Sequence, residues 1–463
     1  MPTTNDGRPT TMSYDTAVAR MFALGHELAQ TPSHKFDLEH MRILLKALEH
    51  PERKFPSVLI AGTNGKGSTA ATLAAILQAS KLKTGLYTSP HLVRINERVR
   101  IDGIPIPDDM FALIHDLVDR TAERLVSEGE LPWHPSFFEM LTAISLEYFA
   151  REKVDIAVLE VGMGGRLDAT NVVEPRVSVI TDVSLDHQKY LGNTVAEIAR
   201  EKAGIIRDSG TVVTLPQSPE ANDVIGNSIL ERGAKAINAV PFIPPVSPGA
   251  PVTGFRVSPD PNVFRTRYSL SVMGEEISIE SPLVGRHQLR NTALAVATAE
   301  ELAKQGFARI TPSSIEVGIR NTHWPGRFQV VPPNEKWPEI VFDVAHNPAG
   351  AWALRSALSS LYEDRRMVFV FGAMRDKAIA EMTEILFPLA ENVVAAAADN
   401  PRSATAAEIR AAAARTATDV EESSSVENAL ERARELAGAG GLIVVTGSIY
   451  VVGEAMRFLG VRI

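Results

Sequence analysis

The amino-acid sequence predicts an α/β protein with two domains. The N-terminal domain is expected to hold a phosphate-binding loop (P-loop) and a mainly parallel sheet with helices on both faces. The C-terminal domain is expected to be a smaller, Rossmann-like α/β unit. Near-continuous Val, Ile and Leu runs alternate with helical patterns, as in parallel sheets that are buried on both faces. A glycine-rich segment joins the first run to a helix, and 463 residues are enough for two to three domains.

The elements of the first domain follow in order along the chain. Apolar runs predict strands at residues 57–61, 85–88, 154–161, 177–181 and 211–215. Helical patterns occur at residues 68–80, 137–151, 195–206 and 285–305. Residues 234–279 are rich in proline and glycine, and residues 267–272 alternate as an exposed strand does. We therefore expect antiparallel excursions or loops attached to the first domain there.

A second strand–helix series follows a short linker. Residues 321–326, which end in Trp-Pro-Gly, predict an interdomain hinge. Apolar runs then predict strands at residues 340–344, 367–371, 393–398 and 442–446. The expected organisation is a disordered tail over 1–12, a first domain over 13–320, the hinge, and a second domain over 327–463.

Composition and charge exclude several classes of protein. Lys and Arg number 47 and Asp and Glu 56, and a net charge of −9 argues against a nucleic-acid binder with a broad basic surface. The absence of cysteine excludes disulfides, thiolate zinc sites and a cysteine nucleophile. Residues 1–12 lack the apolar stretch of a signal peptide, and no apolar run approaches the ~20 residues of a membrane span. We expect a cytoplasmic protein with no nucleic-acid or membrane partner.

The most informative local pattern is the glycine-rich loop after the first predicted strand. It comprises Gly62, Thr63, Asn64, Gly65, Lys66, Gly67 and Ser68, with Thr69 next in the helix. Glycines let backbone amides face an anion at the helix N-terminus. Lys66 is placed for the β- and γ-phosphates of ATP, and Ser68 or Thr69 for phosphate or Mg²⁺. The general P-loop pattern is matched imperfectly, since Ile60 replaces its first glycine and Gly67 follows the lysine, so an ordinary turn is the alternative.

Three polar residues follow predicted parallel strands, at the sheet edge where α/β proteins bind ligands. Ser89, Glu160 and His187 can complete a Mg²⁺ sphere together with phosphate oxygens and water, although histidine is an unusual ligand for Mg²⁺. A turn serine, a satisfied polar residue at a strand end and a structural histidine are the plainer interpretations.

The second domain supplies three more candidates. Asp343 ends a predicted strand, where it is placed to accept from ribose hydroxyls, and His346 follows on the loop within reach of phosphates. Arg327, just past the hinge, is placed to neutralise γ-phosphate charge from across an interdomain cleft. A surface arginine beside Trp324 and Pro325 is its alternative.

Eight motifs, taken in their joint order, resemble those of ATP-dependent amide ligases of the Mur ligase superfamily. Within it, the sequence is similar to the folylpolyglutamate synthase and bifunctional dihydrofolate synthase group. The motifs are GTNGKGS (62–68), TSPHL (88–92), LEVGMGGRLDATN (159–171), LDH (185–187), REKAG (200–204), PGRF (325–328), DVAHNP (343–348) and TGSIY (446–450). The glycines of the third motif do not have the dinucleotide-binding spacing, which argues against an NAD site.

The resemblance implies ATP, Mg²⁺ and a possible monovalent cation such as K⁺ as cofactors. It implies Ser89, Glu160 and His187 as metal ligands. It also implies that Lys202, by default a solvated helix lysine, is carbamylated to hold a second magnesium, and that Asn291 approaches the adenine. The expected catalytic residues are Lys66, Glu160, His187, Lys202, Arg327 and His346.

The resemblance also implies the substrate end of the site. The loop at 162–171 would line a pterin pocket through Asp168 and Ala169, and Phe138 would offer the ring a stacking face, with core packing as its alternative. Ser448 and Tyr450 match positions near the folate or glutamate end. The implied partners are ATP, folate or dihydropteroate, and L-glutamate, and the implied oligomeric state is a monomer.

These residues imply ATP-dependent addition of glutamate through an acyl phosphate, which needs no protein nucleophile. One or both of two activities are open: addition of the first glutamate to dihydropteroate, and extension of reduced folates. Alternatives are a cell-wall Mur ligase, which needs a UDP-sugar peptide site, a non-catalytic nucleotide-binding protein, and a P-loop kinase, which leaves DVAHNP unexplained.

Overall fold

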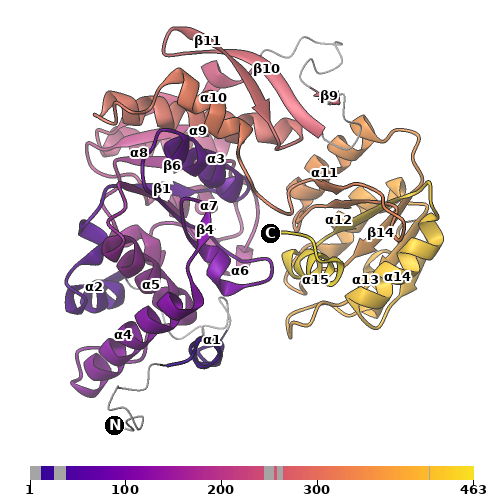
Figure 1. Ribbon diagram of the computed structural model, residues 1–463, viewed down its shortest axis with the longest axis horizontal. Coiled ribbons are helices and arrows are strands. Elements are labelled where there is room, and N and C mark those ends of the chain that lie inside the picture. Colours follow the sequence, from indigo (N-terminus) through magenta and orange to yellow (C-terminus); the bar gives the residue numbers. More distant parts are fainter. Residues whose placement is uncertain (1–11, 26–37, 245–254, 258–263, 417) are drawn as a thin grey trace.

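The computed structural model describes residues 12–25, 38–244, 255–257, 264–416 and 418–463. Two sheets with their own helices lie side by side (Figure 1), and a small antiparallel sheet stands at one end of the larger unit. Apart from Met12, the tail expected at residues 1–12 lies outside the described residues.

The larger sheet has eight strands in the order β4-β3-β2-β5-β1-β6-β7-β8. Their bounds are β1 Ser57–Ala61, β2 Thr84–Tyr87, β3 Val99–Ile101, β4 Ile104–Pro105, β5 Ile156–Glu160, β6 Val177–Ile180, β7 Thr211–Thr214 and β8 Lys235–Asn238. The six strands from β2 to β8 in this order pair in parallel, whereas β3 and β4 form an antiparallel edge. The expected parallel sheet is confirmed.

Helices cover both faces of this sheet. They are α1 Tyr14–Ala23, α2 Leu38–Ala47, α3 Lys66–Ala79, α4 Asp108–Ser127, α5 Phe137–Arg151, α6 Gln188–Leu191, α7 Val195–Ala203, α8 Pro219–Glu231, α9 Arg286–Lys304 and α10 Pro312–Arg320. The 3₁₀ helices are η1 Pro51–Arg53, η2 Ile95–Arg98, η3 Ala169–Val172 and η4 Val240–Phe242. Figure 1 shows α5 and α4 on one side and α3, α9 and α10 on the other.

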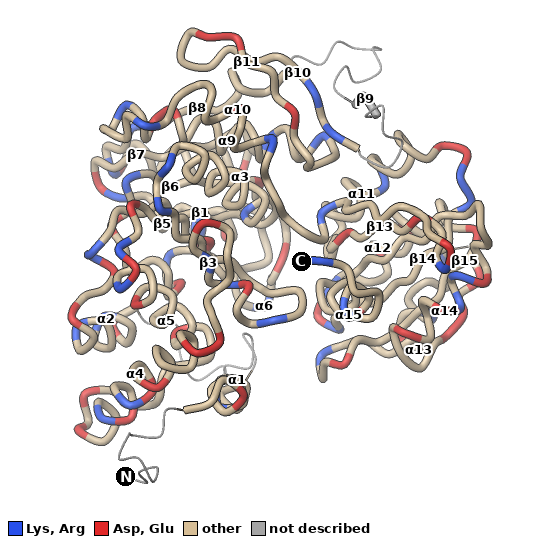
Figure 2. The backbone as a smooth tube through the Cα atoms, in the orientation of Figure 1, with Lys and Arg blue, Asp and Glu red and all other residues tan. Residues whose placement is uncertain are grey.

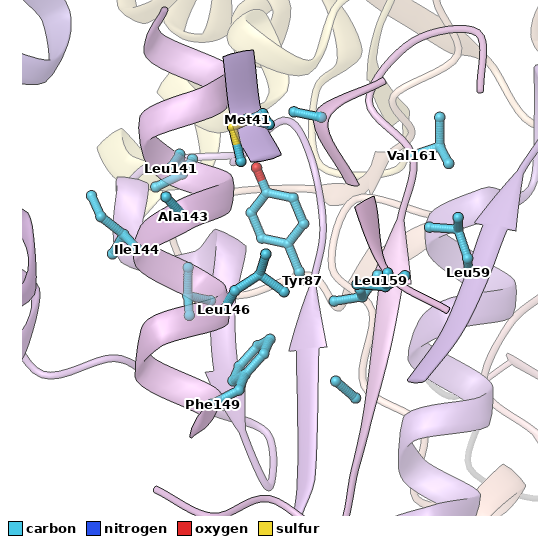
Figure 3. Close-up of a cluster of buried hydrophobic side chains, with 14 of the residues drawn as sticks. Met41, Leu59, Tyr87, Leu141, Ala143, Ile144, Leu146, Phe149, Leu159 and Val161 are labelled. Carbon is cyan, nitrogen blue, oxygen red and sulfur yellow. The ribbon is translucent and has the colours of Figure 1, made fainter. Parts of the chain in front are cut away.

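Alternate residues of each central strand enter different cores. In β1, Leu59 packs with the core beneath α5 and α4, and Val58 with the core beneath α3 and α9. Figure 3 shows the first of these cores, in which Leu141 and Phe149 of α5 lie against Tyr87 of β2 and Leu159 of β5. Burial on both faces explains the near-continuous apolar runs.

The stretch at 234–279 is only partly as expected. Its beginning, β8, continues the main sheet in parallel, which corrects the expectation of antiparallel structure there. Beyond it, β9 Phe255–Val257, β10 Phe264–Val272 and β11 Glu275–Ser281 form the antiparallel sheet. The sequence of β8 hid its pairing because KAIN is an exposed edge strand with little apolar character.

The second sheet has six strands in the order β12-β13-β17-β14-β15-β16. They are β12 Gln329–Val331, β13 Glu339–Phe342, β14 Met367–Phe371, β15 Asn392–Ala395, β16 Val420–Glu422 and β17 Leu442–Thr446, and all pairs are parallel except β12 with β13. Its helices are α11 Pro348–Leu361, α12 Ile379–Leu386, η5 Phe387–Leu389, α13 Ala406–Ala412, α14 Val426–Ala437 and α15 Ile449–Leu459. The four predicted strands are present, and the two that were missed are short, partly exposed edges.

Charge is spread over both units. Figure 2 shows Lys and Arg interspersed with Asp and Glu, without a broad face of one sign in this view. Among the described residues, no helix has the length and apolar character needed to cross a membrane.

Candidate active site

The carboxyl ends of the parallel strands open into one cavity of about 870 Å³ between the two sheets. It is lined by the glycine-rich loop, the loops after β5 and β6, and the loops after β13, β14 and β17. Every residue predicted for the site lines this cavity except Thr69. Thr69 lies one position deeper, fully buried, and its hydroxyl has no hydrogen-bond partner.

The loop turns tightly into α3. Gly65 has φ +88°, and a Cβ on it would lie 2.2 Å from Oδ1 of Asn291, so only glycine fits. Asn291 is buried in the second turn of α9. The Nζ of Lys66 donates to the carbonyls of Gly62 at 3.1 Å and Thr63 at 3.3 Å, at the mouth of the loop.

A charged pair that sequence reasoning missed supports this loop. The carbonyl of Asp182 accepts from the amides of Thr63 (2.8 Å) and Asn64 (3.2 Å). Its carboxylate receives two guanidinium nitrogens of Arg290, at 2.5 and 2.9 Å. The conformation of the loop is therefore stabilised by the residue after β6 and by α9, without a bound ligand.

The three predicted metal ligands lie in the same cavity. Glu160, at the end of β5, accepts from the amide of Ser89 at 3.2 Å. His187 has an unpartnered, buried Nδ1, and burial lowers its pKa to about 4, so the ring is neutral at neutral pH. Among the residues described, no three His, Asp or Glu side chains gather closely enough to hold a metal. A cation here must therefore draw on hydroxyl, phosphate and water oxygens as well, which suits Mg²⁺.

Lys202 is not a solvated helix lysine. Its side chain is buried, and its Nζ donates to the carbonyl of Gly62 at 2.8 Å. Burial, followed by repulsion from Lys66, lowers the pKa of Lys202 to about 7. A substantial fraction of this amine is therefore uncharged near neutral pH, which is the nucleophilic form.

Hydrogen bonds to the Asp168 carboxylate stabilise the loop after β5. Its carboxylate accepts from the amide of Met163 at 2.9 Å and from the amide and hydroxyl of Thr170 at 3.0 and 2.5 Å. Burial raises the pKa of Asp168, and these donors oppose the rise. The ring of Phe138 packs directly against Gly162 of the same loop: a Cβ on Gly162 would lie only 2.4 Å from it. Ala169 is buried beside them on the cavity wall.

Side-chain hydrogen bonds from Asn347 and Lys377 join the two sheets across the cavity. The amide of Asn347, which caps α11, donates to Oδ1 of Asn64 in the glycine-rich loop at 2.9 Å. Lys377, after β14, donates to Asp186 at 2.7 Å, and about nine-tenths of each side chain is shielded from solvent. Burial acts to raise the pKa of Asp186, but the charges of His187 and Lys377 outweigh it and hold that pKa below its ordinary value. The sequence analysis did not single out Lys377, although its place in the loop after the predicted strand at 367–371 is a signal that could have found it.

His346 lies on the same side of the cavity as Lys377. Its Nδ1 donates to the carbonyl of Val344 at 2.9 Å, and its Nε2 lies 3.8 Å from Asp186. Burial, and then the charge of Lys377, lower the pKa of His346 to about 4. The ring is neutral at neutral pH, so the cationic charge that the second unit brings to the cavity comes from arginine and lysine side chains, Arg327, Lys377 and Arg402.

Asp343 and Arg327 lie close enough to interact electrostatically, at the start of the second unit. Asp343 accepts from the amides of Phe328 and Ala345, both at 2.9 Å. Burial raises its pKa and lowers that of Arg327, and the attraction between the two opposes both shifts. The carboxylate of Glu160 also attracts Arg327, so this arginine lies near the end of β5.

Ser448 and Tyr450 close the cavity at the start of α15. The Ser448 hydroxyl accepts from the amide of Tyr450 at 3.2 Å, so it acts as the N-cap of the helix. The Tyr450 hydroxyl accepts from Arg402 at 3.4 Å, and Arg402 also lines the cavity.

A glycine-rich loop at a helix N-terminus, carboxylate and imidazole side chains beside it, and cations from a second α/β unit are typical of a nucleotide-dependent enzyme that works between two such units. Known families agree with this class. The Mur ligase middle domain matches residues 60–299, and the Mur ligase glutamate ligase domain matches residues 326–449. The chain is 38% identical over 377 residues to folylpolyglutamate synthase of Lacticaseibacillus casei, covering 81% of this chain and 83% of that protein.

Two further comparisons span almost the whole chain. Dihydrofolate synthase/folylpolyglutamate synthase of Bacillus subtilis is 33% identical over 425 residues, covering 91% of this chain and 94% of that protein. The crystal structure of Mycobacterium tuberculosis folylpolyglutamate synthase complexed with ADP and AMPPCP superimposes with a TM-score of 0.83 at 31% identity, covering 96% and 99% of the two chains. The chain belongs to the folylpolyglutamate synthase/dihydrofolate synthase group of the Mur ligase family, and it is an ATP-dependent glutamate ligase.

Proposed function

We propose that this ligase adds glutamate both to dihydropteroate and to reduced folates, in each case through an acyl phosphate. One observation carries the proposal: a single cavity holds the phosphate loop, cations from the second domain and the loop that carries Asp168. A pteroyl compound that lies along this cavity has its ring beside Asp168 and Phe138 and its carboxylate near the phosphate loop. Similarity to a bifunctional relative supports the two activities.

The chemical route follows from the groups present. A substrate carboxylate oxygen attacks the γ-phosphorus of ATP, the bond to the β-phosphate oxygen breaks, and ADP leaves. The amine of glutamate then attacks the acyl carbon, and the tetrahedral intermediate collapses to the amide and phosphate with loss of the amine proton. Lys66 from the loop and Arg327 from the second domain neutralise the transferring group, and the Asn64–Asn347 contact holds the two sides in register.

The residues proposed as ligands for Mg²⁺ are Ser89, Glu160 and His187. The neutral, unpartnered nitrogen of His187 is in the protonation state that metal binding needs. Bound there with phosphate oxygens, the cation supplies charge neutralisation for phosphoryl transfer.

Lys202 is proposed to carry a carbamate. Its neutral amine attacks carbon dioxide, an N–C bond forms and the nitrogen loses one proton, so the uncharged amine becomes an anionic carbamate. The pKa of about 7 supports this step, because an ordinary lysine is almost wholly protonated at neutral pH. The product would offer oxygens for a second magnesium beside the phosphate loop.

ADP release by the purified protein tests the proposal. Mg-ATP and glutamate are supplied with dihydropteroate or with tetrahydrofolate, and controls omit either glutamate or the pteroyl compound. Glutamate-dependent release with both compounds supports two activities. Release with tetrahydrofolate alone refutes the dihydropteroate activity, and silence with both refutes the proposal.

A further inference from the structure

A second large groove lies apart from the catalytic cavity, on the first domain. It has a volume of about 1240 Å³ and runs between α2, η1 and the segment at 171–176. Figure 1 places α2 on the side of the first domain remote from the second domain. Of its wall residues only Leu38 also lines the catalytic cavity. Nothing in the proposed reaction uses this groove.

The groove is basic although the chain is acidic. Its wall carries six Lys or Arg side chains against three Glu, whereas the whole chain has a net charge of −9. Among the described residues, no carboxylate lies within ion-pair distance of Lys46, Lys54 or Arg176, and all three are exposed. Repulsion from Arg42 is one of the influences that lower the pKa of Arg207, after burial. The groove therefore favours an anion.

The buried carboxylate of Glu52 indicates that a ligand of this groove must also carry a hydrogen-bond donor. Glu52 is 8% exposed, and its Oε1 is paired with His50 at 2.9 Å and with Arg53 at 3.2 Å. Its Oε2 is buried and has no hydrogen-bond partner. An unsatisfied buried acceptor is unfavourable unless a ligand brings a donor to it. A polyphosphate at neutral pH offers almost only acceptors, whereas a peptide-like polycarboxylate offers N–H groups between its carboxylates.

We propose that this groove binds oligo-γ-glutamyl chains, at a site separate from the catalytic cavity. The inference rests on the proposed function in one respect: such chains are what repeated glutamate addition builds. Exposed ammonium and guanidinium groups meet the carboxylates, and a peptide N–H meets Oε2 of Glu52. The volume of the groove, about 1240 Å³, is large enough for a ligand of several residues.

The floor of the groove is connected to the substrate end of the catalytic cavity. The guanidinium of Arg207 donates to the side chain of Asn171 at 2.9 Å and to the carbonyl of Val173 at 2.6 Å. Asn171 belongs to η3, which begins directly after Asp168. An occupied groove therefore contacts the same short segment that shapes the pteroyl end of the site.

The test is calorimetric titration of the full chain with penta-γ-L-glutamate, which has no pteridine ring, at fixed ionic strength and with AMPPCP present. The Lys46→Glu/Lys54→Glu variant is expected to bind about tenfold more weakly or worse. The matched control is Arg415→Glu/Arg462→Glu, which reverses two exposed charges on the second domain and is expected to bind as wild type does.

The outcomes separate the possibilities. Unchanged affinity in the Lys46→Glu/Lys54→Glu variant, or an equal loss in the control, overturns the assignment. Tripolyphosphate, a linear anion of similar charge, is expected to bind more weakly than the pentaglutamate, and equal or tighter binding overturns the peptide ligand. ADP release with monoglutamyl tetrahydrofolate is expected to be the same in all variants. The titration measures binding and needs no turnover. A failure of the groove to bind pentaglutamate is therefore distinguished from a failure of the proposed reaction, which is measured by ADP release.

Discussion

Replacing Gly162 by alanine tests how closely the pteroyl end of the cavity is packed. A Cβ at this position would lie 2.4 Å from Cζ and 2.7 Å from Cε2 of Phe138, where ordinary contact begins at 3.4 Å. The ring must therefore move by about 1 Å or the loop after β5 must shift by as much. Overpacking of this kind costs about 1–3 kcal/mol of folding free energy. A misplacement of about 1 Å beside a reacting complex lowers the rate by ~10²-fold.

The assay compares kcat/KM for the pteroyl substrate with the affinity for AMPPCP. Gly162→Ala is expected to lower kcat/KM by roughly 10–100-fold and to leave nucleotide affinity within about twofold, because the phosphate loop is not displaced. The double variant Gly162→Ala/Phe138→Leu removes the clash together with the ring, so stability is expected to recover while kcat/KM stays low. Unchanged kcat/KM in Gly162→Ala, or full recovery in the double variant, would refute the stacking role of Phe138.

Three further substitutions test the other parts of the site. Lys66→Ala is expected to lower turnover by ~10³-fold or more. The melting temperature is expected to stay unchanged, because the Lys66 side chain donates only to carbonyls of its own loop. Normal turnover in this variant would place the phosphate site elsewhere. Lys202→Met is expected to abolish activity. Wild-type enzyme depleted of carbon dioxide should regain activity when bicarbonate is added. The recovery should be faster as the pH rises from about 6 to 8, because the Lys202 amine loses its proton in that range. Activity that does not respond to bicarbonate would exclude the carbamate. His287 lines the cavity at the start of α9, and burial lowers its pKa from 6.5 to about 4. As the pH falls through this window, the unfolded chain takes up a proton before the folded chain does, so the free energy of unfolding decreases. His287→Gln should show a smaller loss of unfolding free energy in urea titrations between pH 7 and pH 5, and an identical pH dependence would contradict the assigned pKa.

Part of the site was predictable because ligand-binding residues of parallel α/β sheets lie at the carboxyl ends of the strands. Ser89, Glu160, His187 and Asp343 follow buried strands whose apolar runs are plain in the sequence, so their common edge could be inferred. The joint order of the motifs then identified the family, and the comparisons confirm it.

What escaped prediction depends on contacts between distant segments. Arg290 supports the phosphate loop from a helix about 230 residues further on, and nothing near Asp182 in the sequence announces it. Lys377 meets Asp186 only because the two sheets face each other. Lys202 has the local pattern of a solvated helix residue, and its burial comes from the tertiary packing of α7 against the loop. β8 was misread for a related reason, since an exposed edge strand carries little apolar signal.

Transfer of a carboxylate oxygen to the released phosphate is the most direct measure of the acyl-phosphate route. A pteroyl substrate labelled with ¹⁸O in its reacting carboxylate is turned over with Mg-ATP and glutamate in ordinary water, and the phosphate is analysed by mass spectrometry. If the carboxylate takes the γ-phosphoryl group within this cavity, each phosphate released in ligation carries one labelled oxygen. Unlabelled phosphate accompanying amide formation would contradict the account, because the carboxylate oxygen would then not have become the leaving group.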